Sequence, residues 1–227
     1  ERRPMAFSID TKVGDLAAKH PLSTRVFARH DIDFCCGGGR PLRAVCEEQG
    51  LEPDELLEEI RAEVEGESAA KTDWTEAPLD EVIEHIVEAF HRPLREELPR
   101  LEAMAKKVNR VHGDKRPEML SGIVETFHGL KAELESHMMK EEQVLFPMIR
   151  AGRGGMARGP VSAMEHEHDS AAKALETLRS LTNDYEVPGE ACTTWRALWH
   201  GLEALEEEMH QHIHLENNIL FPRALRS

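Results

Sequence analysis

Two stretches of the chain place a histidine and a glutamate four residues apart and then repeat the same three residues. Residues 137–147 read HMMKEEQVLFP, and residues 212–222 read HIHLENNILFP. Both follow His-x-x-x-Glu-x-x-x-Leu-Phe-Pro, which puts the imidazole and the carboxylate one turn apart on the same face of a helix. Imidazole and carboxylate groups are protein ligands of first-row metal ions. Whether they act as ligands depends on which way the helices turn them.

From Pro78 onward the sequence predicts four long helices separated by short breaks rich in Gly, Pro and Asp. The expected helices are 78–108, 118–149, 160–182 and 190–221. Pro93 and Pro99 interrupt the first helix, so a kink is expected there. Short loops between long helices predict an up-down-up-down four-helix bundle.

Apolar residues recur in each expected helix in alternating steps of three and four, which keeps them on one stripe facing the other helices. The expected stripes are, in chain order, Val87, His91, Leu94, Leu98 and Leu101; Leu120, Ile123, Phe127, Leu130, Leu134, His137, Glu141, Val144 and Met148; Met164, His168, Ala171, Leu175 and Leu178; and Leu198, Leu202, Leu205, Met209, His212, Glu216 and Ile219. Each helix thus places one histidine in its apolar stripe, and two helices add a glutamate. His91 and His168 are 77 positions apart and the two motif histidines 75, which indicates a duplicated helical hairpin.

Burying four imidazoles and two carboxylates in an apolar bundle costs several kcal/mol unless something compensates. A hydrogen-bonded polar layer explains any single buried histidine, but a cation compensates all six groups at once. Nitrogen and oxygen ligands without thiolate argue against one tetrahedral zinc and favour two iron ions, with manganese as the second choice. The predicted ligands are His91, His137, Glu141, His168, His212 and Glu216. Each glutamate is expected to bridge both ions, and each ion to take two histidines.

A carboxylate-rich alternative uses two further acids. Glu88-x-x-His91 and Glu165-x-x-His168 match the Glu-x-x-His motif of ferritin-like di-iron bundles. That ligand set leaves the histidines of the repeated motif without a role. Glu88 and Glu165 also lie one position beyond the apolar stripes, so we expect both to lie outside the ligand set or on the surface.

The remaining histidines of the bundle provide no further ligand set. His210 and His214 have ligand spacing but face away from His212, so a solvated face is expected for them. No pattern is evident for His85, His112, His128, His166 and His200.

The chain is expected to have two domains. Residues 1–65 form a small helical domain, residues 66–77 a polar linker, and residues 78–227 the bundle. The helices expected in the small domain are 13–19, 21–29, 41–49 and 53–64.

The small domain contains a second unusual string, DIDFCCGGGRPL at residues 31–42. Cys35 and Cys36 precede three glycines, which allow the backbone to approach another group closely. Adjacent cysteines form at best a strained disulfide, so two thiols are expected, which bind metal, exchange thiols or pack. The other cysteines, Cys46 and Cys192, are expected to be reduced.

The composition restricts the function classes. Asp and Glu number 43 against 28 Lys and Arg, a net charge of −15, which argues against a nucleic-acid partner because phosphate binding needs a basic surface. No run of about 18 apolar residues occurs, so no membrane span is predicted. The first residues show no signal peptide. We therefore expect a cytoplasmic protein, with Met5 as the native start.

Several strings together resemble one family over nearly the whole chain. DFCCGGGRPL, SHMMKEEQVLFPMI, EHEHDSA, ACTTW and LENNILFPRAL resemble the iron–sulfur cluster repair proteins of the repair-of-iron-centres type (RIC, YtfE/ScdA-type). The resemblance implies an all-α protein with a small N-terminal domain carrying vicinal cysteines and a hemerythrin-like di-iron bundle. The family's ligands fall on the six residues that the apolar stripes select, and its cysteine pair falls on Cys35 and Cys36. The departures are the additional His166, His210 and His214, and Pro93, which follows a ligand and affects how the first helix presents it.

The resemblance implies a stress-response protein that repairs iron–sulfur clusters damaged by nitric oxide or oxidants. It would supply iron from two non-haem, carboxylate-bridged ions, with Cys35 and Cys36 in a redox or transfer role. Two alternatives use the same centre: an enzyme that reduces nitric oxide, or a module that binds or senses dioxygen. The cysteine-bearing domain fits repair or redox chemistry better than carriage of a gas. The expected partners are damaged iron–sulfur proteins and these small molecules, not nucleic acid or membrane, and the chain is expected to be a monomer or a homodimer.

Overall fold

The computed structural model describes residues 7–20, 22–34, 37–64 and 73–227. Within these ranges every regular element is a helix, apart from one isolated β-bridge between Lys12 and Pro41. The prediction of an all-α protein is therefore confirmed. Met5, Cys35, Cys36 and most of the predicted linker lie outside the described residues. In the described part of the chain, no helix has the length and apolar character that crossing a bilayer requires.

The described residues divide into two compact units. One comprises the residues up to Val82 together with His210–Arg226, and the other comprises Ile83–Met209. The first unit thus joins the N-terminal helices to the C-terminal end of the chain.

Four short helices make up the N-terminal part of the first unit. They are α1 (Val13–Lys19), α2 (Ser23–Arg29), α3 (Leu42–Gln49) and α4 (Pro53–Val64), close to the predicted ranges. Phe27, Leu42 and Ile60 are fully buried in their common core. Gly50 ends α3 with a φ of 68°, a left-handed conformation that glycine adopts without steric cost.

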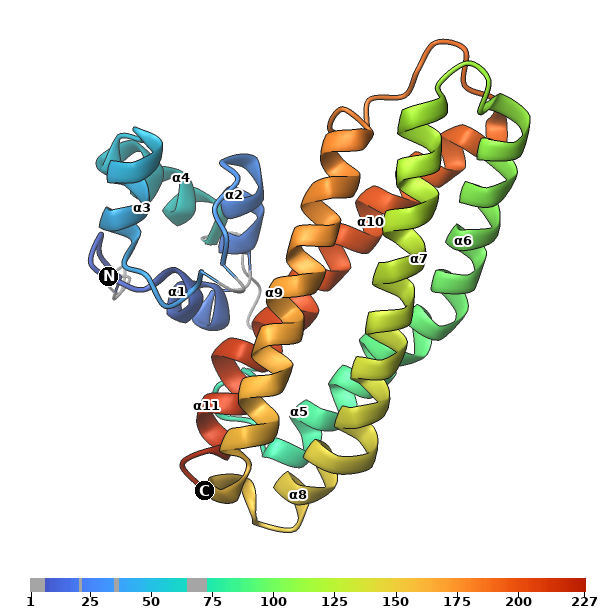
Figure 1. Ribbon diagram of the computed structural model, residues 1–227. Coiled ribbons are helices and arrows are strands. Elements are labelled where there is room, and N and C mark those ends of the chain that lie inside the picture. The colour runs from blue at the N-terminus through green and yellow to red at the C-terminus, as the bar shows by residue number, and fades with distance from the viewer. Residues whose placement is uncertain (1–6, 21, 35–36, 65–72) are drawn as a thin grey trace. The chain divides into compact units, whose positions relative to one another are not determined.

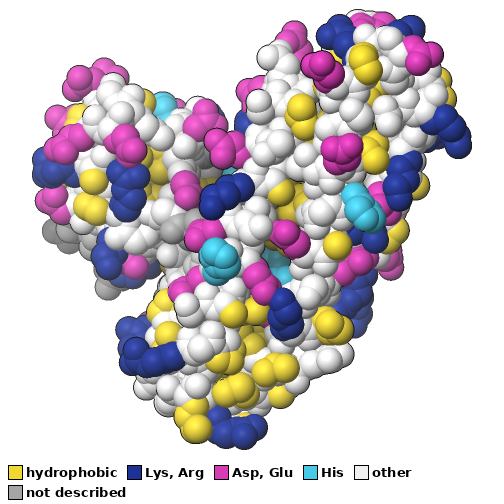
Figure 2. Space-filling view, in the orientation of Figure 1, with side chains coloured by type: hydrophobic (Ala, Val, Ile, Leu, Met, Phe, Trp, Pro, Cys, Tyr) yellow, Lys and Arg dark blue, Asp and Glu magenta, His cyan; other side chains and the backbone are white. Residues whose placement is uncertain are grey.

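The long helices run alternately up and down, as Figure 1 shows for α6, α7, α9 and α10. Their elements are α5 (Leu79–Ile86), η1 (Val87–His91), α6 (Arg92–His112), α7 (Pro117–Lys140), η2 (Glu141–Leu145), α8 (Phe146–Arg150), η3 (Gly154–Met156), α9 (Arg158–Leu181), α10 (Thr193–Leu215), η4 (Glu216–Leu220) and α11 (Phe221–Ala224). Large apolar side chains such as Leu98, Phe127 and Trp199 are fully buried. On the face seen in Figure 2, acidic side chains are interspersed with basic ones. The predicted helical bundle is confirmed.

Three of the long helices contain a π-helical turn, and a proline follows each turn at the second position. The turns are η1, η2 and η4, and the prolines are Pro93, Pro147 and Pro222. In η2 the amide of Phe146 donates to the carbonyl of Glu141, five residues earlier, and η4 repeats this bond between Phe221 and Glu216. In a regular α-helix a proline ring clashes with the carbonyl four residues earlier, and a wider turn moves that carbonyl away. The repeated Leu-Phe-Pro therefore marks the end of a π-turn.

The expected kink in the first helix has a specific form. The helix is interrupted by η1, directly before Pro93, whereas Pro99 lies inside the continuous helix α6. Of the two prolines, only Pro93 therefore coincides with a change of helix type.

The π-turn in the second long helix shifts its buried stripe by one residue. Val144 is 50 % exposed and Met148 is only partly buried, whereas Leu145 and Ile149 are buried. The prediction that Val144 and Met148 belong to the core is wrong. A π-turn closes bonds between residues i and i+5, so it contains one residue more than steps of three and four assume.

The first long helix shows the same shift, and the third helix shows none. Ile86 is fully buried and Val87, the predicted stripe residue, is only partly buried. The prediction for Val87 is therefore wrong for the same reason, because η1 lies between it and the rest of the stripe. Helix α9 has no π-turn, and all five residues of its predicted stripe are buried.

Phe127 tests how tightly the bundle is packed. Its side chain is fully buried in the middle of α7, so we expect Phe127→Ala to lower the free energy of unfolding by about 3–5 kcal/mol. Urea unfolding of the metal-free protein, followed by circular dichroism, measures this change. The control is Val111→Ala, since Val111 is 61 % exposed and should change stability by at most about 0.5 kcal/mol. A loss below about 1 kcal/mol for Phe127→Ala would contradict close packing at this position.

Candidate metal centre

Each π-turn begins or ends at one of the predicted ligands. His91 is the last residue of η1, Glu141 the first of η2 and Glu216 the first of η4. The regular helices α7, α9 and α10 supply the other three histidines. All six side chains are buried: His91, His137, Glu141, His168, His212 and Glu216. Single π-turns occur frequently at functional sites, where they change the direction in which a side chain points.

The six side chains form two groups of neighbouring ligand atoms. One group is His91, Glu141, His212 and Glu216, the other is His137, His168 and Glu216, and within each group all the ligand atoms lie within 4.8 Å of one another. Glu216 belongs to both groups. Its carboxylate therefore lies within reach of both sets of histidines.

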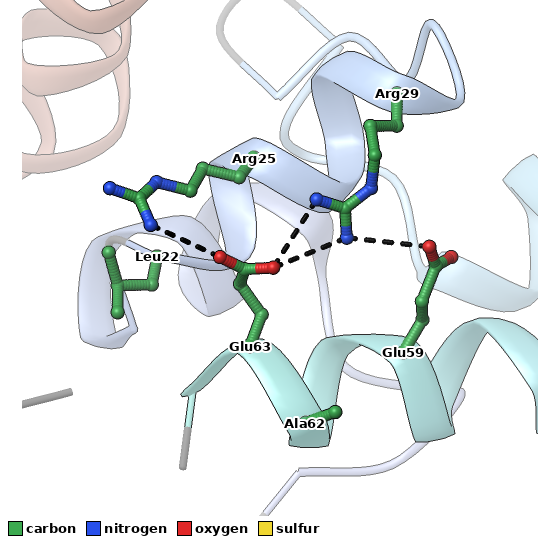
Figure 3. A pocket seen from close by; sticks show the side chains of 6 residues that line it. All are labelled: Leu22, Arg25, Arg29, Glu59, Ala62 and Glu63. Carbon is green, nitrogen blue, oxygen red and sulfur yellow. Dashed lines mark hydrogen bonds and ion pairs between the residues drawn. The ribbon is translucent and has the colours of Figure 1, made fainter. Parts of the chain in front are cut away.

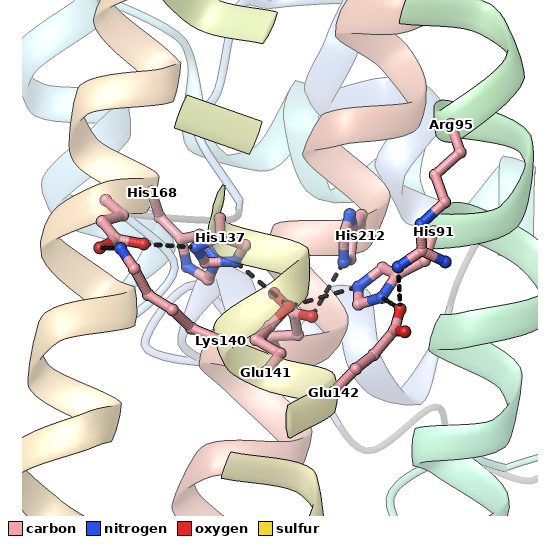
Figure 4. Close-up of polar contacts among 10 residues, drawn as sticks. His91, Arg95, His137, Lys140, Glu141, Glu142, His168 and His212 are labelled. Atoms are coloured by element: carbon pink, nitrogen blue, oxygen red, sulfur yellow. Dashed lines mark hydrogen bonds and ion pairs between the residues drawn. The ribbon is translucent and has the colours of Figure 1, made fainter. Parts of the chain in front are cut away.

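Glu141 also reaches histidines of both groups. Its Oε2 lies 3.3 Å from Nε2 of His91 and 3.3 Å from Nε2 of His137. Nε2 of His168 lies 3.1 Å from the same nitrogen of His137. Figure 4 shows these rings turned toward Glu141 inside the bundle. Nε2 of His91 and Nε2 of His137 thus approach the same carboxylate oxygen from the two ligand groups.

The polar atoms of the cluster fit a cation. Among the described residues, both carboxylate oxygens of Glu141 are buried without a hydrogen-bond donor. Burying an uncompensated carboxylate is costly, and a cation would remove this cost. Neither group contains a thiolate, and mixed imidazole and carboxylate ligands suit iron or manganese.

A partly exposed acid holds the outer nitrogen of His91. Nδ1 of His91 donates to Glu142 at 2.7 Å, and Arg95 donates to the same carboxylate at 2.7 Å. Burial by itself would raise the pKa of Glu142, but the hydrogen bonds from His91 and Arg95 bring it below its usual value. Glu142 is therefore an anion that keeps the proton of His91 on Nδ1 and turns Nε2 toward the cluster.

His137 has the same kind of support on the other side of the cluster. Its Nδ1 donates to Glu167 at 3.0 Å, and Lys140 pairs with that carboxylate. Burial acts to raise the pKa of Glu167, but hydrogen bonds from Lys140 and His137 lower it overall. Both acids thus fix the ring orientation of a histidine of the cluster.

The sequence does not show that the acids Glu142 and Glu167, or their basic partners Arg95 and Lys140, support the histidines of the cluster. Glu142 directly follows Glu141 in the sequence, and charged residues at such positions usually belong to a solvated helix face. Arg95 lies one turn after His91, and Lys140 lies three residues after His137. Both are on exposed positions of their helices. Only the tertiary structure shows that they act on the histidines through a shared acid.

The two acids of the ferritin-like alternative lie outside the cluster. Glu88 pairs with Arg92 on the surface at 2.6 Å, and its side chain is 48 % exposed. Glu165 is also exposed. Neither contributes to the groups of ligand atoms in the described residues.

His214 does not lie on a solvated face. It is 6 % exposed, and its Nδ1 donates to the backbone carbonyl of Phe34 at 3.1 Å. The prediction for His214 is therefore wrong, because N-terminal residues of the same unit cover this side of α10. Burial lowers the pKa of His214 to about 4, so the ring is neutral at pH 7. His210 is partly buried, and its ring lies edge-on to the Phe34 ring at 6.0 Å.

A surface pocket between α2 and α4 provides no comparable set of groups. It is lined by Leu22, Arg25, Arg29, Glu59, Ala62 and Glu63, shown in Figure 3. Glu63 pairs with both arginines, and Glu59 pairs with Arg29. The charged groups of this pocket thus neutralise one another.

The fold and the buried histidine and glutamate groups define a hemerythrin-like cation-binding protein. Residues 82–224 match the family model of the Hemerythrin HHE cation binding domain. Residues 9–64 match the ScdA_N model, which is described as a domain of unknown function (DUF542).

The chain belongs to the family of iron–sulfur cluster repair proteins, which confirms the resemblance seen in the sequence. It is 48 % identical over 221 residues to the iron–sulfur cluster repair protein YtfE of Cronobacter sakazakii, covering 97 % of this chain and 98 % of the relative. The YtfE protein of Dickeya chrysanthemi is 46 % identical over 217 residues, covering 96 % and 97 %. That of Escherichia coli O81 is 45 % identical over 216 residues, covering 95 % and 97 %.

The proline after η2 offers a test of the π-turn. In Pro147→Ala the steric conflict that favours the wider turn is removed, so Glu141 is held less firmly toward the cluster. We expect this variant to bind ferrous iron several-fold more weakly, with its helix content unchanged or slightly raised. Anaerobic titration with a competing chelator measures the affinity.

The matched control is Pro160→Ala, in the first turn of α9, where a missing amide proton costs no helical hydrogen bond. It should bind iron as the unaltered protein does. Equal affinity of both variants would mean that packing alone maintains the π-turn.

Proposed function

We propose that this protein repairs iron–sulfur clusters damaged by nitric oxide or oxidants, and that it supplies iron carried at the cluster of buried histidines and glutamates. The observation that carries the proposal is the placement of Glu141, whose buried oxygens reach histidines of both ligand groups. Relatives covering nearly the whole chain are named iron–sulfur cluster repair proteins, which supports the same function.

The proposed cargo is two iron ions per chain. His91 and His212 would hold one ion, and His137 and His168 the other, in line with the two groups of ligand atoms. Glu141 and Glu216 would bridge both ions. Bound there, a pair of ferrous ions would supply exchangeable coordination positions and a releasable source of iron.

Release of iron requires ligands that bind well but do not bind permanently. Both ligand groups lack thiolate, which makes them weaker for soft metals than cysteine-rich sites. The acids Glu142 and Glu167 connect the buried histidines to solvent, with side chains 28 % and 29 % exposed. Protonation or ion pairing at these acids would change how firmly His91 and His137 are held. We propose damaged iron–sulfur proteins as the partners and the cytoplasm as the place of action.

The direct test is reactivation of a damaged enzyme. An iron–sulfur enzyme inactivated with nitric oxide is incubated anaerobically with the iron-loaded protein, and its activity and the iron remaining on the protein are measured. We expect activity to return as iron leaves the protein. Conversion of added nitric oxide to nitrous oxide, without loss of iron and without reactivation, would instead identify a nitric oxide reductase.

The bridging role of the two glutamates is tested by metal content. Glu141→Ala and Glu216→Ala should each disturb both ions, because each carboxylate reaches both histidine groups. His91→Ala should mainly disturb one ion. Iron analysis with Mössbauer spectroscopy measures content and coupling.

The surface acids supply matched controls for this experiment. Glu88→Ala and Glu165→Ala each remove an exposed carboxylate three residues before His91 or His168, outside the cluster. Iron content should therefore stay at about two ions per chain. Intact coupling in both bridging variants, or loss of iron in the controls, would rule out this ligand set.

The vicinal cysteines are proposed to act in transfer rather than in holding the iron. The described residues already supply four histidines and two glutamates, so Cys35→Ser with Cys36→Ser should keep near-normal iron content and absorption. Reactivation of the damaged enzyme should fall at equal iron loading. If the double variant and the unaltered protein reactivate the enzyme equally, the cysteines have no role in transfer. If the double variant loses iron, the thiols take part in holding the ions.

A further inference from the structure

An exposed cysteine and a histidine meet at one end of the bundle and belong to neither ligand group. Sγ of Cys192 lies 3.4 Å from Nε2 of His112, a hydrogen-bond distance for sulfur. His112 is the last residue of α6, and Cys192 directly precedes α10; Figure 1 shows these two helix ends at the same end of the bundle. Cys46, in contrast, is buried in the core of the N-terminal helices. Of these two thiols, only that of Cys192 faces solvent.

Cys192 occupies the position that caps the N-terminus of α10. Its carbonyl accepts from the amide of Arg196 at 3.0 Å, at the start of a helix of 23 residues. The first amides of a helix have no partner within the helix and carry partial positive charge. Reactive cysteines in proteins are found at helix N-termini and next to histidines, because a negatively charged sulfur is the nucleophile. Cys192 has both of these surroundings.

A buried tryptophan supports the ring of His112. The ring centroids of His112 and Trp195 lie 5.1 Å apart, and Trp195 is fully buried against Trp199. The imidazole therefore rests on a fixed surface while Nε2 faces the sulfur. Nε1 of Trp195 is buried with no hydrogen-bond acceptor among the described residues, which is costly. A peptide-like group joined to Cys192 would bring acceptor oxygens to the neighbourhood of this ring.

The charged side chains near the pair carry a small positive excess. Glu190 pairs with Arg116 at 3.0 Å, and Asp114 and Lys115 belong to the same turn after His112. Arg196 lies one turn into α10 and donates to the carbonyl of Ala191 at 3.2 Å. Three basic residues thus stand against two acidic ones, on a chain whose net charge is −15. An anionic reagent is therefore less repelled here than elsewhere on the chain.

We propose that Cys192 and His112 form a site of thiol–disulfide exchange for anionic, peptide-like disulfides of low molecular weight. Nε2 of His112 accepts the thiol proton, and the sulfur of Cys192 attacks one sulfur of the disulfide. A new S–S bond forms as the old one breaks, and the leaving thiolate takes the proton from the imidazolium. The cysteine is oxidised to a mixed disulfide, and the other half of the reagent is reduced to a thiol. This site does not depend on the function proposed for the buried cluster.

The experiment treats the full-length protein with glutathione disulfide under anaerobic conditions and follows each cysteine by mass spectrometry of its peptides. At pH 7 we expect Cys192 to form the mixed disulfide about tenfold faster than in His112→Gln, the factor that a hydrogen bond to a charged group sets. Glutamine keeps a polar end of similar size but takes up no proton. At about pH 10 a thiol ionises without a base, so the two rates should converge. Cys46 should stay unmodified at pH 7, because it is buried.

His200→Gln is the matched control, because His200 is exposed on the same helix as the cysteine. Its rate should equal that of the unaltered protein at both pH values. Equal rates for His112→Gln and the unaltered protein at pH 7 would overturn the proposal. A difference that persists at about pH 10 would overturn it as well, since His112 would then act by packing alone.

A second comparison applies if His112→Gln does not fold, which circular dichroism shows. A synthetic peptide of residues 188–196 contains the same thiol without the histidine or the folded helix. Cys192 of the unaltered protein should react faster than this peptide at pH 7, and a rate no higher than that of the peptide would refute the site.

Discussion

The stability of the bundle depends on what compensates the free-energy cost of two buried carboxylates. Glu141 and Glu216 are fully buried, and their carboxylates lie among the ring nitrogens of four histidines. An uncompensated carboxylate in such a place costs several kcal/mol, a large share of the net stability of a folded chain. A cation bound among the histidines compensates both carboxylates at once. Binding of a cation there would therefore stabilise the folded bundle, and loss of that cation would lower its stability.

The π-turns allow one helix to carry both ligand side chains and tightly packed apolar side chains. A regular helix with a strict stripe would continue the core past each ligand at fixed steps. Glu141 follows His137 by one regular turn and points inward, and the extra residue in η2 then makes Leu145 and Ile149, rather than Val144 and Met148, continue the core. The prolines make this conformation less costly than it would otherwise be, since a regular helix would clash with the ring. Repetition of the turn in η4 places Glu216 in the same way.

The outer acids extend the site to the surface. Glu142 and Glu167 each accept a hydrogen bond from a histidine of the cluster and pair with a basic side chain near the solvent. Hydrogen bonds from these basic groups and the histidines keep the pKa of both acids low, against the effect of burial. The orientation of His91 and His137 therefore depends on acids whose basic partners, Arg95 and Lys140, have side chains 45 % exposed.

The sequence by itself determined the helical class, the ranges of the helices and the six residues brought together in the cluster. This was possible because the apolar steps are regular on α7, α9 and α10 up to the ligands, and the histidine–glutamate motif occurs twice. Only the tertiary structure decided the register next to η1 and η2, since Val144 and Leu145 are equally apolar and a π-turn leaves little trace in the apolar pattern. In the sequence, the proline two positions after each π-turn is the signal that could have predicted the turn. The burial of His214 was likewise undecidable from the periodicity of its own helix, because the residues that cover it, around Phe34, are far away along the chain. Periodicity reports one helix at a time, whereas burial depends on every segment that packs against it.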